Sequence, residues 1–168
     1  MLGALQQHAL PFAILNIGGV SNVTVVYDRS DFAFTSSNVV AFDTGPGNAL
    51  LDDFMMERTG HAIDRDGEHA ARGKPNVSRV RAALLEMEDF LRQPPPKSLD
   101  RNRWHGLLHS CTSGMAVDDG AATLTLLTAS AIEASTRVLR RGRPKSWFVT
   151  GGGRQNPVMM RMLRMLLK

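Results

Sequence analysis

The sequence predicts an α/β fold with a mixed sheet. Three antiparallel strands come first along the chain, and helices pack on the sheet. Two short apolar runs, Phe12–Ile17 and Val23–Tyr27, flank the turn "GGVSN", which is typical of a β-hairpin. A third run, Val39–Phe42, follows. From Asn48 the apolar spacing changes to that of a helix. We therefore expect the order strand-strand-strand-helix within the first sixty residues.

Three helical regions are expected before the last strand. The first begins at Asn48 and stops at Gly60, a typical C-terminal glycine. The segment 60–74 indicates a loop with one or two helical turns. A second helix covers 77–91 and is closed by three consecutive prolines. A third is capped by Asp118 or Asp119 and ends near Gly142.

The C-terminal region adds a fourth strand, residues 147–150, which we expect to join the same sheet. Asn156 and Pro157 are typical N-cap and N1 residues, so they predict a final helix. Apolar residues lie on most sides of that helix, which indicates that further structure covers it. The sequence therefore resembles a chain cut short at this end.

Length and composition favour one soluble domain. The chain has 168 residues, 43% of them hydrophobic. No apolar run approaches the roughly 18 residues of a membrane span, and the N-terminus lacks the marks of a signal peptide. The single Cys111 excludes an internal disulfide, and the scattered histidines form no recognisable metal-ligand set. These features predict a cytoplasmic protein without a membrane partner.

The positive charge is concentrated near the C-terminus. Net charge is +4, and Arg137–Lys168 contains nine basic and no acidic residues. Such a stretch is either a patch for phosphate or nucleic acid, or a solvated face with basic residues at helix ends. Aromatic residues for base stacking are nearly absent there, which favours the solvated face. A nucleic-acid-binding domain stays an alternative interpretation.

Glycine clusters follow three of the four predicted strands: "NIGGVSN", "FDTGPGN" and "VTGGGRQN". Backbone without a Cβ can approach a ligand closely, and successive N–H groups can hold phosphate oxygens. The third cluster also leads into a helix N-terminus, which favours anions. One such turn serves ordinary chain reversal, but three favour a phosphorylated ligand. There is no P-loop, and "GPGNAL" is a poor match to a dinucleotide fingerprint.

Five segments resemble, in order, the motifs of the anhydro-N-acetylmuramic acid kinases. They are "ILNIGGVSNVTVV", "FDTGPGNALLDDF", "PPPKSLDR", "ATLTLLTASAI" and "VTGGGRQNPVMMRML". These are bacterial enzymes of the sugar kinase, heat-shock and actin-like ATPase superfamily. The resemblance implies a ribonuclease H-like lobe, with ATP and sugar bound between two such lobes. It also implies a role in cell-wall (peptidoglycan) recycling.

The resemblance implies a specific reaction. Water opens the 1,6-anhydro ring while the freed O6 takes the γ-phosphoryl group of ATP, with Mg²⁺ neutralising charge. Asp43 is implied as the general base on that water. The alternative role of Asp43 is a hydrogen-bonding turn residue. Nucleotide contacts are implied for Gly18, Gly19, Gly151, Gly152, Gly153 and Asn156, and sugar contacts for Thr44, Gly45, Asn48, Lys97 and Ser98. For Lys97 a solvated loop position is an equally good interpretation.

The sequence also departs from the family. Leu99 and Asp100 replace the Thr and Gly of the usual Lys-Ser-Thr-Gly-Arg motif. The family's first phosphate loop, Gly-Thr-Ser-Leu-Asp-Gly, is absent, as is its closing helix. Residues 1–168 are therefore expected to be the C-terminal lobe of such a kinase, truncated at both ends. Alone it would be inactive, or completed by an N-terminal lobe or a second copy; a non-catalytic nucleotide- or sugar-binding lobe is the alternative.

Overall fold

The structure is a computed structural model that describes residues 9–28 and 38–168. The prediction that the N-terminus lacks a signal peptide concerns mainly residues outside this described part. Four strands form one sheet in the order β3-β2-β1-β4. They are β1 (Phe12–Ile17), β2 (Ser21–Val26), β3 (Val39–Gly45) and β4 (Ser146–Thr150). The predicted hairpin, third strand and fourth strand are thus confirmed.

The sheet is mixed, and its strand directions decide where the loops lie. β1 pairs antiparallel with β2, β2 pairs antiparallel with β3, and β1 pairs parallel with β4. β1, β3 and β4 therefore point the same way, and their carboxyl ends share one edge of the sheet. The turns that follow these three strands are the three glycine clusters.

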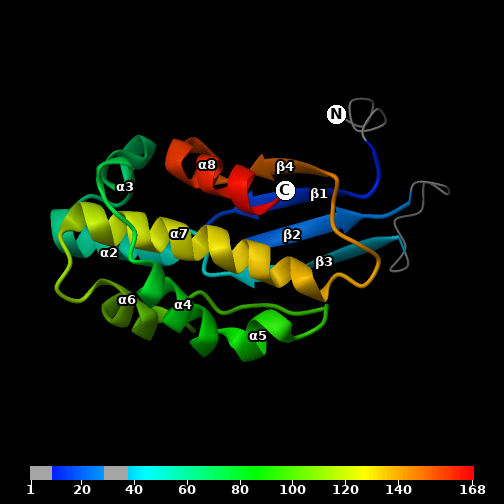
Figure 1. The fold of residues 1–168 in the computed structure, drawn as a ribbon, viewed down its shortest axis with the longest axis horizontal. Coiled ribbons are helices and arrows are strands. Elements are labelled where there is room, and N and C mark those ends of the chain that lie inside the picture. The colour runs from blue at the N-terminus through cyan, green and yellow to red at the C-terminus, as the bar shows by residue number, and fades with distance from the viewer. Residues whose placement is uncertain (1–8, 29–37) are drawn as a thin grey trace.

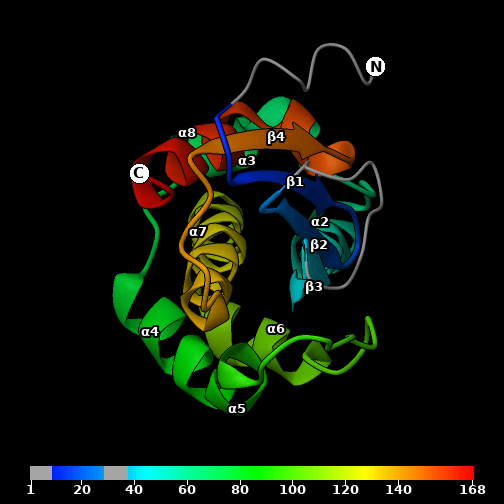
Figure 2. The same cartoon turned by 90° about the vertical axis from the view of Figure 1, so that its right-hand side faces the viewer.

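One long helix organises the rest of the chain. α7 (Val117–Ser135) is buried along most of its length and contacts α2 (Ala49–Thr59), α3 (Glu68–Arg72), α4 (Val77–Glu86) and β3. Figure 2 shows α7 between α8 (Pro157–Leu166) with β4 on one side and α4, α5 (Glu88–Arg92) and α6 (His105–Thr112) on the other. Leu124 and Leu127 pack in the core beneath α4–α6, while Ala129 and Ile132 pack against the sheet. Both hydrophobic cores thus depend on α7 (Figure 1).

Several helix predictions needed correction. The single helix over 77–91 is two helices, because the chain bends at the fully buried Met87 and thereby directs Phe90 and Leu91 into the core. α7 has Ala116 at its N-cap and no side-chain cap, and it ends at Ser135, well before Gly142. α6 was not predicted. Gly60 does end α2, in the left-handed conformation, as predicted.

The last helix is amphipathic, which corrects the prediction of apolar residues on most sides. Val158, Met159 and Leu163 are buried, whereas Arg161 and Arg164 are exposed. The arginines therefore form an exposed face of the helix, which is compatible with both interpretations of the basic C-terminal stretch. Asn156 caps the helix with its side chain and Pro157 follows it, as the sequence predicted.

Candidate functional site

The first two glycine turns are joined by backbone hydrogen bonds. The Asn48 N–H donates to the Gly18 carbonyl at 2.8 Å, and the Ala49 N–H donates to the Gly19 carbonyl at 3.2 Å. Gly47 has φ +56°, and a side chain there would collide with the Gly18 carbonyl. The start of α2 is thus fixed against the β1–β2 turn. Its first amides are consequently occupied within the protein.

The third turn lies against the end of β1. Gly151 has φ +81°, and a Cβ there would lie 2.5 Å from the Ile17 carbonyl oxygen. Gly153 packs on the Ile17 side chain, close to the Asn48 amide. The three glycine turns, which are far apart in the sequence, therefore meet at one edge of the sheet. The predicted nucleotide glycines and Asn48 are brought together.

The glycines at this edge divide into two groups. Gly47, Gly151 and Gly153 leave no room for a side chain, so they permit the turns to pack on one another. At Gly18, Gly19 and Gly152 a Cβ would meet nothing closer than 3.6 Å. These three positions are therefore the less crowded part of the edge, where a ligand has more room to approach the backbone.

The sequence predicted that the turn after β4 leads directly into the final helix, but it does not. A 3-10 turn, Gly152–Gln155, intervenes. Asn156 is buried, and its side-chain oxygen accepts hydrogen bonds from the Val158 and Met159 amides at 2.9 and 3.0 Å. The first amides of α8 are therefore capped by the protein. This geometry gives Asn156 a structural role in the turn, and the predicted anion site at the helix N-terminus is lost.

Asp43 lies inside β3, not at its end, because the strand continues past Phe42 to Gly45. The side chain is half-buried. Its Oδ2 accepts a hydrogen bond from the Leu99 backbone N–H at 2.7 Å, and its own N–H donates to the Lys97 carbonyl at 3.1 Å. One bond thus holds the Asp43 carboxylate and the other holds its main chain, and both come from residues 97–99.

Lys97 fits neither interpretation drawn from the sequence. It is 7% exposed, so it is not a solvated loop residue. Its Nζ donates to the Phe90 and Leu91 carbonyls at 2.9 and 3.0 Å, which leaves it turned toward the end of α5 and away from solvent. Burial lowers the pKa of this ammonium to about 8. A direct sugar or phosphate contact by the Lys97 side chain is therefore inconsistent with this structure.

The other predicted sugar-binding residues differ in access. Thr44 is fully buried and shares a 2.7 Å hydrogen bond with Ser21. Gly45 is buried as well. Any contact from these two positions would have to come from the backbone. Ser98, in contrast, is exposed between the buried residues Lys97 and Leu99.

An acidic and basic cluster borders the β1–β2 turn and was missed as a candidate. Arg101 lies against Gly19 and forms a 2.8 Å ion pair with Asp53 of α2. Burial raises the pKa of the neighbouring Asp52 carboxyl to about 6, with Arg101 opposing the shift and Asp53 adding to it. This cluster could be found only from the position of "KSLDR" beside the glycine turns in space. The sequence alone does not reveal that position.

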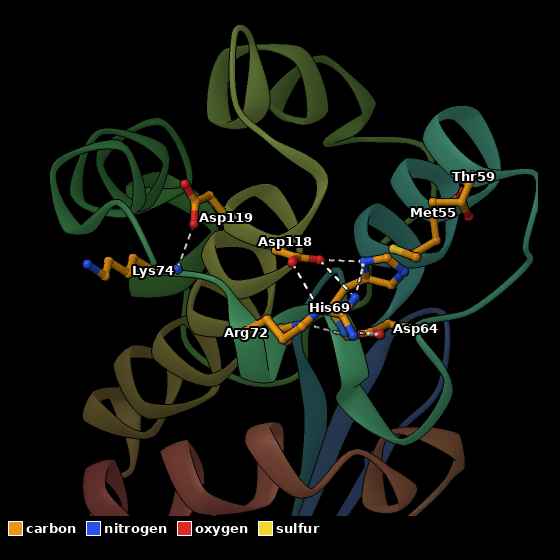
Figure 3. A network of polar contacts seen from close by, with 9 residues as sticks. Met55, Thr59, Asp64, His69, Arg72, Lys74, Asp118 and Asp119 are labelled. Carbon is orange, nitrogen blue, oxygen red and sulfur yellow. Dashed lines mark hydrogen bonds and ion pairs between the residues drawn. The ribbon is translucent and has the colours of Figure 1, made fainter.

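A separate polar network fixes α3 against α7, as Figure 3 shows. His69 Nδ1 lies 2.6 Å from Asp118 Oδ1, and Arg72 Nε donates to Asp118 Oδ2 at 3.0 Å. Hydrogen bonds from Arg72 and then from His69 lower the pKa of the Asp118 carboxyl. Asp119 accepts from the Lys74 backbone amide at 2.7 Å. The two aspartates thus bind neighbouring segments, not the amides of their own helix.

The described residues show neither a metal-ligand cluster nor a membrane-spanning helix. Within 9–28 and 38–168, no three His, Cys, Asp or Glu side chains are grouped so that they could hold a metal ion. In that same part of the chain, none of the helices has the length and apolar character required to cross a bilayer.

Comparison with known proteins gives a consistent result. Residues 3–168 match the family described as "Anhydro-N-acetylmuramic acid kinase". Curated proteins of that name are similar to this chain: one from Nitrobacter winogradskyi is 47% identical over 154 residues, and one from Azorhizobium caulinodans is 49% identical over 157. The aligned parts cover 92% and 91% of this chain but 38% and 39% of those relatives. The chain thus spans about two fifths of the relatives' length.

Proposed function

Because the chain belongs to the anhydro-N-acetylmuramic acid kinase family, we propose that it carries the catalytic base and one wall of the ATP site of such a kinase. The observation that carries this proposal is the meeting of three glycine turns at the edge of the sheet where β1, β3 and β4 end. In open α/β sheets, ligands bind at the carboxyl ends of strands. The whole reaction would phosphorylate the sugar at O6 as its anhydro ring opens, in the course of cell-wall recycling.

In this proposal Asp43 accepts a proton from the attacking water. The Leu99 amide fixes Oδ2 at 2.7 Å. Oδ1 accepts no hydrogen bond from any of the described residues, so that oxygen can take the proton. A positioned general base contributes about 10² to 10⁴ in rate. The half-buried strand position supports this role, because it limits the orientations of the carboxylate.

Gly18, Gly19 and Gly152 are the residues proposed to lie beside ATP, since a Cβ at each would make only ordinary contacts, at 3.6 Å or more. ATP would supply the phosphoryl group, and Mg²⁺ would neutralise the negative charge of the phosphates. Gly151 and Gly153 support this wall by packing on β1 and Asn48. Contacts to the sugar would come from the side-chain amide of Asn48, the exposed Ser98 and the backbone at Thr44 and Gly45.

We further propose that residues 1–168 form a ribonuclease H-like C-terminal lobe of a cytoplasmic enzyme. Four strands of a mixed sheet with helices packed on it agree with an actin-like ATPase lobe. Such an enzyme holds ATP and substrate between two walls, and proximity supplies much of the catalysis. A second lobe, or a second copy of the chain, would complete the cleft.

The test uses a hybrid kinase, in which residues 9–168 replace the matching segment of the Nitrobacter winogradskyi relative. Asp43→Asn should lower kcat by about 10² or more, with the KM for ATP changed by less than about twofold. Asp89→Asn, at an exposed aspartate, is the matched control. Full activity of the Asp43→Asn hybrid would leave Asp43 only a structural role, as the strand residue that binds the Leu99 amide. An equal loss of ATP affinity would instead indicate that the carboxylate holds Mg²⁺.

A further inference from the structure

Lys97 is a buried lysine whose partners are all supplied by the protein backbone and by aromatic rings. Its Nζ donates to two carbonyls at the end of α5, those of Phe90 and Leu91. The same ammonium lies 5.3 Å from the ring centre of Phe42 and 4.7 Å from that of Phe90. Phe42 belongs to β3 and precedes Asp43. The ammonium therefore connects the end of α5 with the strand that carries the candidate base.

The backbone around Lys97 completes this connection. The Lys97 carbonyl accepts the Asp43 N–H at 3.1 Å, and two residues later the Leu99 N–H donates to Asp43 Oδ2 at 2.7 Å. The side chains of Lys97 and Leu99 are both buried, while Ser98 points outward. Residues 97–99 thus run beside β3 and grip Asp43 through two hydrogen bonds.

An apolar side chain could fill the same space but could not make these bonds. Transfer of an amine from water into the interior is unfavourable unless its hydrogen bonds are replaced. The lowered pKa of Lys97 reflects that cost. Only a long side chain that ends in several donors can reach both carbonyls from a position beside β3. The position therefore selects the chemistry of lysine and not merely its volume.

We propose that Lys97 is a positioning residue, which anchors residues 97–99 so that the Leu99 amide holds the Asp43 carboxylate in a fixed orientation. The catalytic meaning of this anchor rests on the proposed function of Asp43. The anchor itself does not, because it can be measured in the absence of turnover.

The first experiment measures amide hydrogen exchange by NMR in the 168-residue chain. Lys97→Met should accelerate exchange at the Leu99 and Asp43 amides by about tenfold or more, with the Leu127 amide of α7 unchanged. Lys145→Met, at an exposed lysine, is the matched control and should change none of the three. Unchanged exchange at Leu99 would overturn the proposal. So would acceleration in step with Leu127, since that is general destabilisation.

If Lys97→Met does not fold, Lys97→Gln replaces it, because its shorter side chain keeps a donor but cannot reach both carbonyls. Lys97→Arg keeps several donors and should retain more Leu99 protection than either. If Lys97→Arg lost as much protection at the Leu99 amide as Lys97→Met or Lys97→Gln, the anchoring role would be contradicted.

The second experiment measures kinetics in the hybrid kinase. Lys97→Met should lower kcat by about tenfold or more while the KM for ATP stays within about twofold. A rise in the KM for ATP with unchanged kcat would place Lys97 in nucleotide binding and overturn the proposal. If Asp43→Asn proves fully active, the proposed function fails. The exchange experiment still tests the anchoring role of Lys97, because it does not depend on turnover.

Discussion

Thr128, in the middle of α7, donates its hydroxyl to the Gly47 carbonyl at 2.6 Å, across 81 positions of sequence. Both residues are buried. The bond ties the central helix to the turn after β3, at the point where that turn packs on the β1–β2 hairpin. The geometry of the glycine edge thus depends on a hydroxyl supplied by the central helix.

Replacement of Thr128 by valine tests this bond. Valine keeps the shape but leaves the buried Gly47 carbonyl without its donor, so the free energy of unfolding should fall by about 1–3 kcal/mol. Thr125→Val is the matched control, because the Thr125 hydroxyl only bonds the Ala121 carbonyl one turn back in the same helix. Urea unfolding of both variants measures the difference. Equal losses would show that the link to Gly47 has no special weight.

Gly151→Ala should destabilise the fold. The φ of +81° is unfavourable for alanine by about 1–2 kcal/mol, and the new Cβ would press on the Ile17 carbonyl. Thermal unfolding should therefore show a clear decrease in Tm. Gly106→Ala is a suitable control, since a Cβ there meets nothing within 4 Å. An unchanged Tm would mean that the turn after β4 is not held against β1.

Gly19→Ala should behave in the opposite way. A Cβ at Gly19 meets only the flexible side chain of Arg101, at 3.7 Å or more, so stability should change by less than about 1 kcal/mol. If ATP approaches this backbone, the KM for ATP in the hybrid kinase should rise about tenfold. The Gly106→Ala hybrid serves as control. Unchanged ATP kinetics would remove Gly19 from the nucleotide site.

Asp52 should make stability depend on pH. Burial raises the pKa of its carboxyl to about 6 in the folded chain, above the unfolded value of 3.8. The folded state therefore holds the proton more tightly, and the resulting stabilisation is present below about pH 4 and lost as pH rises through about 6.

Asp52→Asn removes this titration. The variant should be more resistant to urea than the parent chain at pH 7, and the difference should shrink as pH falls toward 4. Glu57→Gln, at an exposed acidic residue of the same helix, is the control and should bring no such gain. A constant difference between Asp52→Asn and the parent across this pH range would exclude the titration as its cause.

Local chemistry made much of the framework predictable. Apolar runs with turn residues between them located all four strands, and Gly60, Asn156 and Pro157 marked helix ends, because each signal acts within a few residues of the chain. The same local reasoning failed at Met87, where the helix is interrupted although its apolar pattern reads as continuous. It also missed α6 and extended α7 too far.

The sequence by itself determined that glycine turns follow β1, β3 and β4, and that an aspartate precedes one of them. Only the tertiary structure decided that these turns meet, because the parallel pairing of β1 with β4 brings their carboxyl ends to one edge. It also decided the place of Lys97: the motif reads as a polar loop, yet the lysine is buried against carbonyls of α5. The burial of Lys97 and the hydrogen bond between Leu99 and Asp43, which are 56 positions apart, arise from packing between distant segments. No local pattern in the sequence encodes such packing.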